Sequence, residues 1–323
     1  MDNMAVIGLD LGGTKLSAAI FNQDGMASAK TVENLNNRRG KEVGQMIIHQ
    51  VTRFLEDIRR DNMHINAIGI SVPGIFYPIT GRVWANNIPG WDDYPLLDDI
   101  ARAIHDPEIK ICIDNDRSCC VLGETWMGKA RGCRDVVFLL IGTGIGAGIM
   151  VNGQIVGGST GAAGAAGWLA LDRPYKPTYL SCGCFEYHAS GKGIVKVAKE
   201  YLREDKSYNG VLKEIEQENI TSEQIFSAFS QGDPIAKKTL QRAIEYWGMA
   251  IANIVSMFNP EKIILGGGLF GPGLQFLNNI VDEAQKWAQP VSIKHVQIDG
   301  SALGNDTALF GAGYLALQAL NKL

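Results

Sequence analysis

The sequence lacks an excess of charge of either sign, with 30 Lys and Arg residues against 34 Asp and Glu residues and a formal net charge of -4. Proteins that bind nucleic acid or anionic membranes by displacing counterions need clustered Lys and Arg. We therefore expect neither nucleic acid nor a membrane as a partner, and we expect a small molecule instead.

Long hydrophobic runs and cysteines are also scarce. The longest nearly apolar run, Val136 to Val151, is interrupted by four glycines and falls short of the ~18 residues of a membrane span. No basic segment precedes an apolar run at the N-terminus, so no secretory signal is expected. Six cysteines in 323 residues are too few for a disulfide-based fold. These absences predict a reduced, cytoplasmic protein.

Length and glycine content are the first positive signals. Single hydrophobic cores stop growing near ~250 to 300 residues, so a chain of 323 residues predicts two domains. No low-complexity linker separates them, which predicts a hinge near residues 116 to 134. Glycine makes up 38 residues, well above the usual share of ~7%, so the backbone is expected to approach a ligand closely in several places.

Hydrophobic periodicity predicts alternating strands and helices, an α/β fold. Strand, glycine turn and strand follow one another between Met4 and Phe21, and the same order recurs with a strand over 136–141, a glycine turn over 142–148 and a strand over 149–151. This duplication predicts two similar domains: a small one of residues 1–117 with 306–323, and a larger one of residues 118–305. The other expected strands are 65–72, 109–113 and 262–265, and the expected helices are 43–58, 95–105, 186–203, 222–229, 234–258 and 306–320.

The opening motif GLDLGGTK, residues 8 to 15, has the residue types that hold a polyphosphate. Gly12 and Gly13 allow backbone N–H groups to approach phosphate oxygens, and Thr14 adds a hydroxyl. Asp10 can hold Mg²⁺ through water, and Lys15 adds a positive charge. It is not a Walker A loop, because no Gly-Lys pair is followed by Ser or Thr. The alternative is an ordinary β-hairpin.

Two further glycine runs carry the same logic. Gly142, Thr143 and Gly144 follow a strand, but the next residues again predict a strand and not the helix that a dinucleotide fingerprint requires. The run from Gly266 through Gly267 to Gly268 does precede a predicted helix. Three such turns favour the duplicated nucleotide clamp of an actin-like ATPase fold, with an unliganded relic of that site as the alternative.

Asp116 is the candidate catalytic residue, because it follows a strand and opens the helix RSCCVLGETW. A kinase acting on an alcohol needs one carboxylate at the acceptor hydroxyl, and the adjacent Asn115 can orient the acceptor. The alternative role for Asp116 is a helix N-cap.

Two other patterns carry less weight. Gly157-Ser159-Gly161 lacks the strand and helix of a hydrolase elbow, and Cys182, Cys184 and His188 form a weak metal signal.

In order and spacing, these motifs resemble the ROK family of repressors and sugar kinases, over nearly the whole chain from Val6 to Leu317. The resemblance rests on DLGGTK, VWANNIPGW (residues 83–91), DNDRSCCVLGE (114–124) and LIGTGIGAGI (140–149). It implies an actin-like two-domain fold with ATP in the cleft and Asp116 as the base on a sugar hydroxyl, commonly the 6-hydroxyl of a hexose. It also implies sugar contacts from Gly74, Asn87, Asn115 and Glu186, and a homodimer.

The sequence departs from the family in its sugar and zinc motifs. Ala165 and Trp168 stand where the family has a sugar-binding Glu and a His that binds zinc and sugar, and Pro177 and Tyr179 stand where two zinc cysteines would be. Only Cys184 remains of the four ligands, so zinc is not expected. Trp168 is either a sugar-stacking residue or a core aromatic, and the acceptor is expected to differ from plain glucose.

The predicted function is transfer of the γ-phosphate of ATP, with Mg²⁺, to a sugar or sugar-like acceptor. The alternative is a catalytically weak sugar sensor of the same family without a DNA-binding domain, since the first phosphate strand begins within a few residues of Met1. A filament-forming or chaperone ATPase with water as acceptor is a third hypothesis, against which Asn87, Asn115, Asp116 and Glu186 argue.

Overall fold

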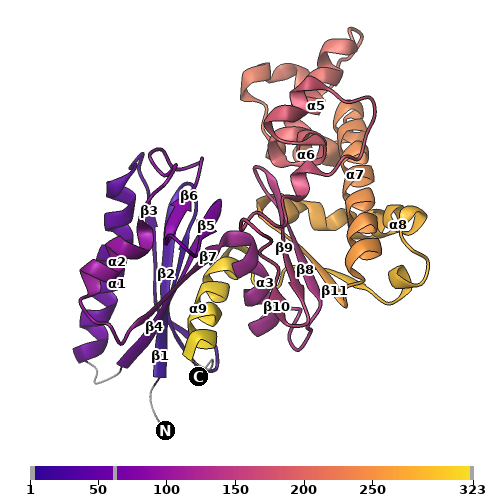
Figure 1. Ribbon diagram of the computed structural model, residues 1–323. Coiled ribbons are helices and arrows are strands. Elements are labelled where there is room, and N and C mark those ends of the chain that lie inside the picture. Colours follow the sequence, from indigo (N-terminus) through magenta and orange to yellow (C-terminus); the bar gives the residue numbers. More distant parts are fainter. Residues whose placement is uncertain (1–3, 61–63, 321–323) are drawn as a thin grey trace. The chain divides into compact units, whose positions relative to one another are not determined.

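The computed structural model describes residues 4–60 and 64–320 and has two compact units (Figure 1). Unit 1 comprises Met1–Gly132, Ile155–Ala163 and Asn305–Leu323, and unit 2 comprises Cys133–Gln154 and Gly164–Gly304. The division falls within the expected hinge region but after residue 132, not after residue 117. Helix α3 (Asp116–Trp126) stays with unit 1 because it packs on α9 (Thr307–Leu320).

Unit 1 is built on a five-stranded sheet in the order β3-β2-β1-β4-β7. β1 runs antiparallel to β2 and parallel to β4, and β4 runs parallel to β7. Side chains alternate between the two sheet faces, so Ile7 and Leu9 join the core with helix α1 while Val6 packs with Leu309 of α9. The strands are β1 (Met4–Leu11), β2 (Lys15–Asn22), β3 (Ala27–Asn34), β4 (His64–Val72) and β7 (Lys110–Asn115), with α1 (Lys41–Arg60) and α2 (Leu96–Ile104).

The α9 helix approaches both the sheet and α3 closely because small residues leave room for it. Gly69 of β4 faces the Ala312 carbonyl, and Gly311 of α9 faces the Cys119 carbonyl of α3, at distances that leave no space for a side chain. This packing fixes the start of α3, which carries Asp116. A short ribbon of β5 (Ile75–Tyr77) and β6 (Arg82–Trp84) completes the unit.

Unit 2 repeats this plan with the strand order β10-β9-β8-β11-β12. β8 is antiparallel to β9 and parallel to β11. Helix α7 is the centre of its helical layer and packs against α4, α5, α6 and α8. The strands are β8 (Val136–Ile141), β9 (Ile145–Val151), β10 (Gln154–Ile155), β11 (Lys262–Gly266) and β12 (Gln297–Gly300), and the helices are α4 (Cys184–Ala189), α5 (Gly191–Glu204), α6 (Ser222–Ser230), α7 (Pro234–Phe258) and α8 (Leu277–Trp287).

Three local predictions were wrong. Strand β3 was not expected, because its mostly exposed sequence ASAKTVEN lacks an apolar alternation. The helix expected over 186–203 is two helices, since Ser190 ends α4 and its hydroxyl accepts a hydrogen bond from Gly193 N (3.0 Å), which caps α5. The second glycine turn is shorter than residues 142–148, because β9 begins at Ile145.

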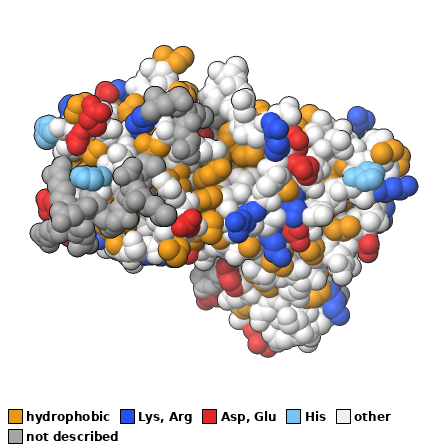
Figure 2. Space-filling view, turned by 90° about the horizontal axis from the view of Figure 1, so that it is seen from below, with side chains coloured by type: hydrophobic (Ala, Val, Ile, Leu, Met, Phe, Trp, Pro, Cys, Tyr) orange, Lys and Arg blue, Asp and Glu red, His pale blue; other side chains and the backbone are white. Residues whose placement is uncertain are grey.

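The surface agrees with the balanced charge of the sequence. On the face that Figure 2 shows, Lys and Arg side chains lie among Asp and Glu side chains and do not gather by sign. Among the helices of residues 4–60 and 64–320, none combines the length and the apolar character needed to cross a membrane.

Candidate active site

The first phosphate motif forms the tight turn between β1 and β2. Gly12 N donates to the Lys15 carbonyl (2.8 Å), and the Thr14 carbonyl accepts from Leu35 N (2.8 Å). The Gly13 backbone lies against Asn87, whose Nδ2 would be 3.1 Å from a Cβ at Gly13. Gly13, Thr14 and Asn87 line one pocket of about 650 Å³ in unit 1, together with residues 34–39 and 88–89. The structure therefore brings together a predicted phosphate turn and a predicted sugar residue.

Asp10 lies near the end of β1, where its Oδ1 accepts a hydrogen bond from Ser71 Oγ (2.7 Å) of β4. Burial raises the pKa of Asp10 to about 6, and the negative charges of Asp116 and Asp306 act in the same direction. Ser71 and the Lys15 charge oppose this shift. A cation nearby would relieve the repulsion among these carboxylates, and oxygen donors are the ligands that Mg²⁺ prefers. The donor set therefore fits the magnesium assigned to Asp10.

Asn115 and Asp116 lie at the junction of β7 and α3. Asn115, not Asp116, is the N-cap of α3, because Asn115 Oδ1 accepts a hydrogen bond from Ser118 N (2.9 Å). The Asn115 Nδ2 donates to Asp114 Oδ1 (2.9 Å). The side chain of Asn115 is buried, and its hydrogen bonds with Ser118 N and Asp114 Oδ1 fix its orientation. The capping role considered for Asp116 is wrong, and the Asp116 carboxylate is available for another task.

Asp116 is a partly exposed carboxylate beside the charged side chain of Arg117. Its Oδ1 accepts from Arg117 N (2.9 Å), and Arg117 Nε lies 3.9 Å from the same oxygen. Burial raises the pKa of Asp116, and this outweighs the lowering effect of Arg117. A carboxylate with a raised pKa is a stronger base than an exposed one. Arg117 also donates from Nη2 to the Gly74 carbonyl (3.3 Å), which ties the predicted sugar residue Gly74 to the start of α3.

Asp114 and Ser71 are residues of this site that the sequence prediction missed. Asp114 Oδ1 accepts hydrogen bonds from both the backbone N and the side-chain Nδ2 of Asn115, which orients Asn115. Burial raises the pKa of Asp114. Ser71 orients Asp10. The signal for both was their place near the ends of β4, which lies next to β1 in the sheet, and of β7, which lies next to β4. The strand order that places Ser71 between Asp10 and Asp114 could not be read from the sequence.

The second phosphate turn opens onto a pocket of about 580 Å³ within unit 2. Gly142 N donates to the Gly144 carbonyl (2.9 Å), and Gly191 N at the start of α5 donates to the Gly142 carbonyl (2.8 Å). Cationic Lys192 and Lys196 line the same pocket as Gly142 and Thr143. Its apolar lining residues, which the prediction missed, are Val195, Ile220, Phe226, Leu269 and Pro272. Backbone N–H groups, two cations and an apolar wall suit a nucleotide.

The three glycines of the third run, Gly266 to Gly268, differ in what surrounds them. Gly266 lies against the Phe138 ring, and Gly267 has φ +94° with its Cα against the Ile141 backbone. Neither tolerates a side chain. Gly268 has open space beside its Cα and lines the same pocket as Gly142 and Thr143. Of the run, Gly268 is thus the residue placed to face a ligand, and Gly266 and Gly267 shape the turn.

Glu186 lies in the first turn of α4, where its Oε2 accepts a hydrogen bond from Ile145 N (2.7 Å). Burial raises the pKa of Glu186, while the Ile145 hydrogen bond and the charges of Lys196 and Lys192 lower it in part. The backbones of Gly144 and Gly167 both press against this side chain. One residue therefore joins the second phosphate turn to the segment that carries Trp168.

Trp168 is not a core aromatic, because its side chain is 56% exposed. It ends a short 3-10 helix, Ala166–Trp168, and Gly183 packs against its backbone. Ala165 beside it is exposed as well. Of the two roles that the sequence left open for Trp168, the structure removes the buried one.

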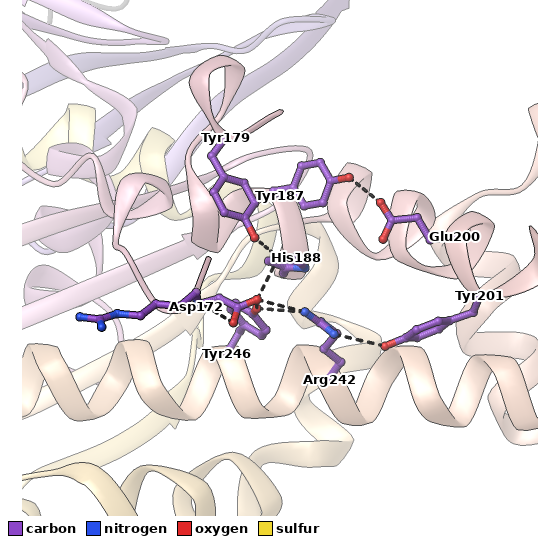
Figure 3. Close-up of polar contacts among 9 residues, drawn as sticks. Asp172, Tyr179, Tyr187, His188, Glu200, Tyr201, Arg242 and Tyr246 are labelled. Carbon is purple, nitrogen blue, oxygen red and sulfur yellow. Dashed lines mark hydrogen bonds and ion pairs between the residues drawn. The ribbon is translucent and has the colours of Figure 1, made fainter. Parts of the chain in front are cut away.

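The donor set does not fit a structural zinc. The Tyr179 hydroxyl lies 2.8 Å from His188 Nε2 in a buried pair, so this imidazole nitrogen is already engaged (Figure 3). No group of three or more His, Cys, Asp or Glu side chains with metal-binding geometry occurs in the described part of the chain. A tetrahedral site needs four such ligands.

Comparisons with known proteins agree with this arrangement. A family model described as "ROK family" matches residues 6–319. A glucokinase of Halalkalibacterium halodurans is 30% identical over 100% of this chain and 98% of that protein. A xylose repressor of Caldicellulosiruptor bescii is 25% identical over 95% of this chain and 76% of that protein. A ROK family glucokinase structure from Streptomyces griseus, in complex with glucose and AMPPNP, has a TM-score of 0.77 and 26% identity, covering 97% of this chain and 99% of that one.

The chain therefore belongs to the ROK family. It has the actin-like fold of ROK sugar kinases, in which two domains share one sheet topology, as units 1 and 2 do here. The predicted family and fold class are confirmed.

Proposed function

We propose that this ROK protein transfers the γ-phosphate of ATP to the 6-hydroxyl of a hexose or hexose-like acceptor. Kinship with glucokinases supports the broader assignment, an ATP-dependent carbohydrate kinase. The observation that carries the proposed catalysis is Asp116, a partly exposed carboxylate of raised pKa whose neighbour Asn115, not Asp116 itself, caps the helix.

In the proposed reaction, Asp116 accepts the proton of the acceptor hydroxyl as that oxygen attacks the γ-phosphorus. The O–H bond breaks, a new O–P bond forms, and the bond from the γ-phosphorus to the bridging oxygen breaks to leave ADP. The capped and buried Asn115 presents its remaining amide hydrogen in a fixed orientation, which suits positioning of the acceptor. Asn87, Gly74, Glu186 and Trp168 are the other proposed acceptor residues.

ATP is assigned to Gly12, Gly13, Thr14 and Lys15 of unit 1 and to Gly142, Thr143, Gly144 and the run Gly266 to Gly268 of unit 2. In unit 2 the apolar wall of the pocket suits the base, and Lys192 and Lys196 suit phosphate oxygens. The charge of Lys15 also lowers the pKa of Asp10 in part. Asp10 would hold Mg²⁺ through water, and that ion would neutralise phosphate charge.

The test is ADP release from MgATP with a panel of hexoses, N-acetylhexosamines, anhydro sugars and inositols, followed by NMR of the product to locate the phosphate. Asp116→Asn removes the base, and general-base assistance contributes about 10² to 10⁴ in rate, so kcat falls by that factor while ATP affinity is retained. The activity of the wild type decreases as the pH is lowered, because protonated Asp116 cannot accept a proton. Asp24→Asn, at an exposed turn of unit 1, is the matched control. Wild-type turnover by Asp116→Asn would refute the assignment.

A catalytically weak sugar sensor is the second candidate, and Ala165 and Trp168 favour it because neither offers an acceptor the polar contacts expected there. The same assay separates the two. A kinase shows acceptor-dependent ADP release that Asp116→Asn abolishes. A sensor binds sugar in calorimetry without turnover, and Asp116→Asn then changes nothing that the coupled assay measures.

A further inference from the structure

Three large apolar side chains gather without cover in one short segment of unit 2. Trp168, Tyr175 and Leu180 are 56%, 64% and 72% exposed. All three line a single pocket of about 440 Å³, whose polar lining includes Asp172 and Arg173. Clustered exposed apolar groups beside a hollow are uncommon on a folded chain unless they bind something. We call this hollow the Trp168 pocket.

A partly buried polar network ties this segment to helices α4 and α7 (Figure 3). Asp172 Oδ2 accepts from the Tyr246 hydroxyl (2.8 Å) and from Arg242 Nη2 (3.2 Å), both on the long helix α7. Tyr179 is hydrogen bonded to His188 of α4, which is itself only 1% exposed. The segment from residue 169 to 183 has no helix or strand besides the 3-10 turn Pro177–Ser181, so these bonds fix its path.

Such a fixed arrangement is what a binding surface requires. Residues of a site bind better when their own conformation is set beforehand, because less entropy is lost on association. Here the Asp172 hydrogen bonds hold the loop between Trp168 and Tyr175, and the Tyr179 hydrogen bond holds the backbone next to Leu180. The apolar side chains thus project from backbone that is tied to α4 and α7.

The Trp168 pocket lies near Glu186, a residue of the proposed acceptor site. Gly167, the neighbour of Trp168, presses its backbone against the Glu186 side chain, and Gly183 lies against the backbones of Gly167 and Trp168. Gly183 lines the Trp168 pocket and precedes α4, the helix that carries Glu186. Glu186 and the Trp168 pocket are therefore neighbours in unit 2, with the backbone of Gly167 and Gly183 between them.

We propose that the Trp168 pocket binds the second ring of a disaccharide or glycoside acceptor, with Trp168 and Tyr175 under the apolar C–H face of that ring. Aromatic faces carry partial negative charge and attract C–H groups, and ligand sites combine such faces with a few polar groups. Asp172 and Arg173 at the same pocket supply acceptor and donor for its hydroxyls. This inference rests on the proposed kinase function and narrows its substrate to acceptors longer than one sugar.

The test compares glucose with methyl glucoside and with glucosyl-glucose disaccharides in the ADP-release assay. Wild-type kcat/KM is higher for at least one disaccharide than for glucose. Trp168→Ala and Tyr175→Ala each raise the KM for that disaccharide roughly threefold to tenfold, the usual size of an aromatic contact, and Tyr175→Ala leaves kcat and the KM for glucose and ATP unchanged. Trp168→Tyr, which keeps a ring, restores most of the affinity.

Trp287→Ala is the matched control, since Trp287 is 62% exposed at the end of α8 and lines no part of the Trp168 pocket. Glucose used as well as every disaccharide, with no KM change in Trp168→Ala, overturns the inference while the kinase stands. A change in oligomeric state in place of sugar affinity also overturns it. If no acceptor is turned over, the proposed function fails instead, and calorimetry with the disaccharides decides the pocket: binding that Trp168→Ala weakens supports it, and its absence refutes it.

Discussion

Units 1 and 2 have the same five-stranded plan, yet they place different chemistry on it. In both, the first strand is central, the second is antiparallel to it, and the two later strands add in parallel on its other side. The first strand of each leads into a glycine turn. Two residues before that turn, unit 1 has Asp10 and unit 2 has Leu140.

The same contrast holds at the ends of the neighbouring strands. In unit 1, β7 ends in Asp114, Asn115 and then Asp116, whereas β12 of unit 2 ends at Gly300 and β11 leads into Gly266 to Gly268. Unit 1 thus gathers Asp10, Asp114 and Asp116 at its strand ends. The unit 2 pocket places Lys192 and Lys196 beside its glycine turns, with the carboxylate of Glu223 also in its lining. A duplicated frame allows this difference, because the same strands and turns can carry different side chains.

Replacing the residue that distinguishes the two turns is expected to have the largest effect. In Asp10→Asn the carboxylate assigned to Mg²⁺ is lost, so kcat falls by about 10² to 10³, the usual cost of removing one preorganised electrostatic group. The Kd for ATP then no longer improves when Mg²⁺ is added. Stopped-flow turnover and calorimetry with and without the metal measure both.

Leu140→Ala, at the counterpart position in unit 2, is the control for Asp10→Asn. It lies on a strand of the unit 2 sheet and carries no charge. We expect its Mg²⁺ dependence to equal that of the wild type. An Asp10→Asn variant with normal kcat would mean that unit 1 does not hold the metal through this residue.

Variants of the third glycine run of the chain, Gly266 to Gly268 in unit 2, test whether each glycine shapes the turn or faces the nucleotide. Gly268→Ala adds a methyl group in open space at the nucleotide pocket, so the Kd for ATP rises on the order of tenfold with Tm unchanged. Gly267→Ala forces a side chain into φ +94° against the Ile141 backbone and costs about 1 to 3 kcal/mol of stability. Calorimetry and thermal unfolding separate the two, and equal effects of both variants on Tm and Kd would contradict the distinction.

Much of the fold was predictable because its signals are local. The apolar run of β8 was matched residue for residue, and α7 begins at Pro234 and ends at Phe258 as its proline and periodicity predict. Strand β3 was missed because an exposed edge strand carries no apolar alternation. The break at Ser190 was missed because apolar spacing continues across it, and only the cap on Gly193 N marks the boundary.

Residues of the candidate site could be predicted from the sequence only where the residue type and its local position indicate the role. Glycine at a strand end and Asp10 at the turn could be found from the sequence, and the structure brings Gly13 together with Asn87 in one pocket. Ser71 and Asp114 could not, since their roles depend on which strands become neighbours. The α5 start that closes the unit 2 pocket was hidden within a predicted longer helix. Contacts that depend on strand order, or on a break between two helices, thus cannot be predicted from patterns in a single sequence.

The pH dependence of stability is also expected to differ between one buried group of each unit, Asp10 in unit 1 and His188 in unit 2. Burial raises the pKa of Asp10 in unit 1 to about 6, so the native state binds a proton more tightly than the unfolded chain, and this term loses stability as the pH rises from about 4 to 6. Burial, helped by Arg242 and Lys176, lowers the pKa of His188 in unit 2 to about 4, so its term gains stability as the pH rises from about 4 to 6.5.

Each term is worth on the order of 3 kcal/mol, and in the wild type the two nearly cancel between pH 4 and 6. Asp10→Asn removes the first term, so its free energy of unfolding rises with pH across this window relative to that of the wild type. His188→Gln removes the second, so its free energy of unfolding falls with pH on the same comparison. Urea unfolding of both variants and the wild type at half-unit pH steps measures these slopes. Parallel curves for the three proteins would show that neither group titrates differently on folding, and opposite slopes would show that the duplicated frame buries an acid in one unit and a base in the other.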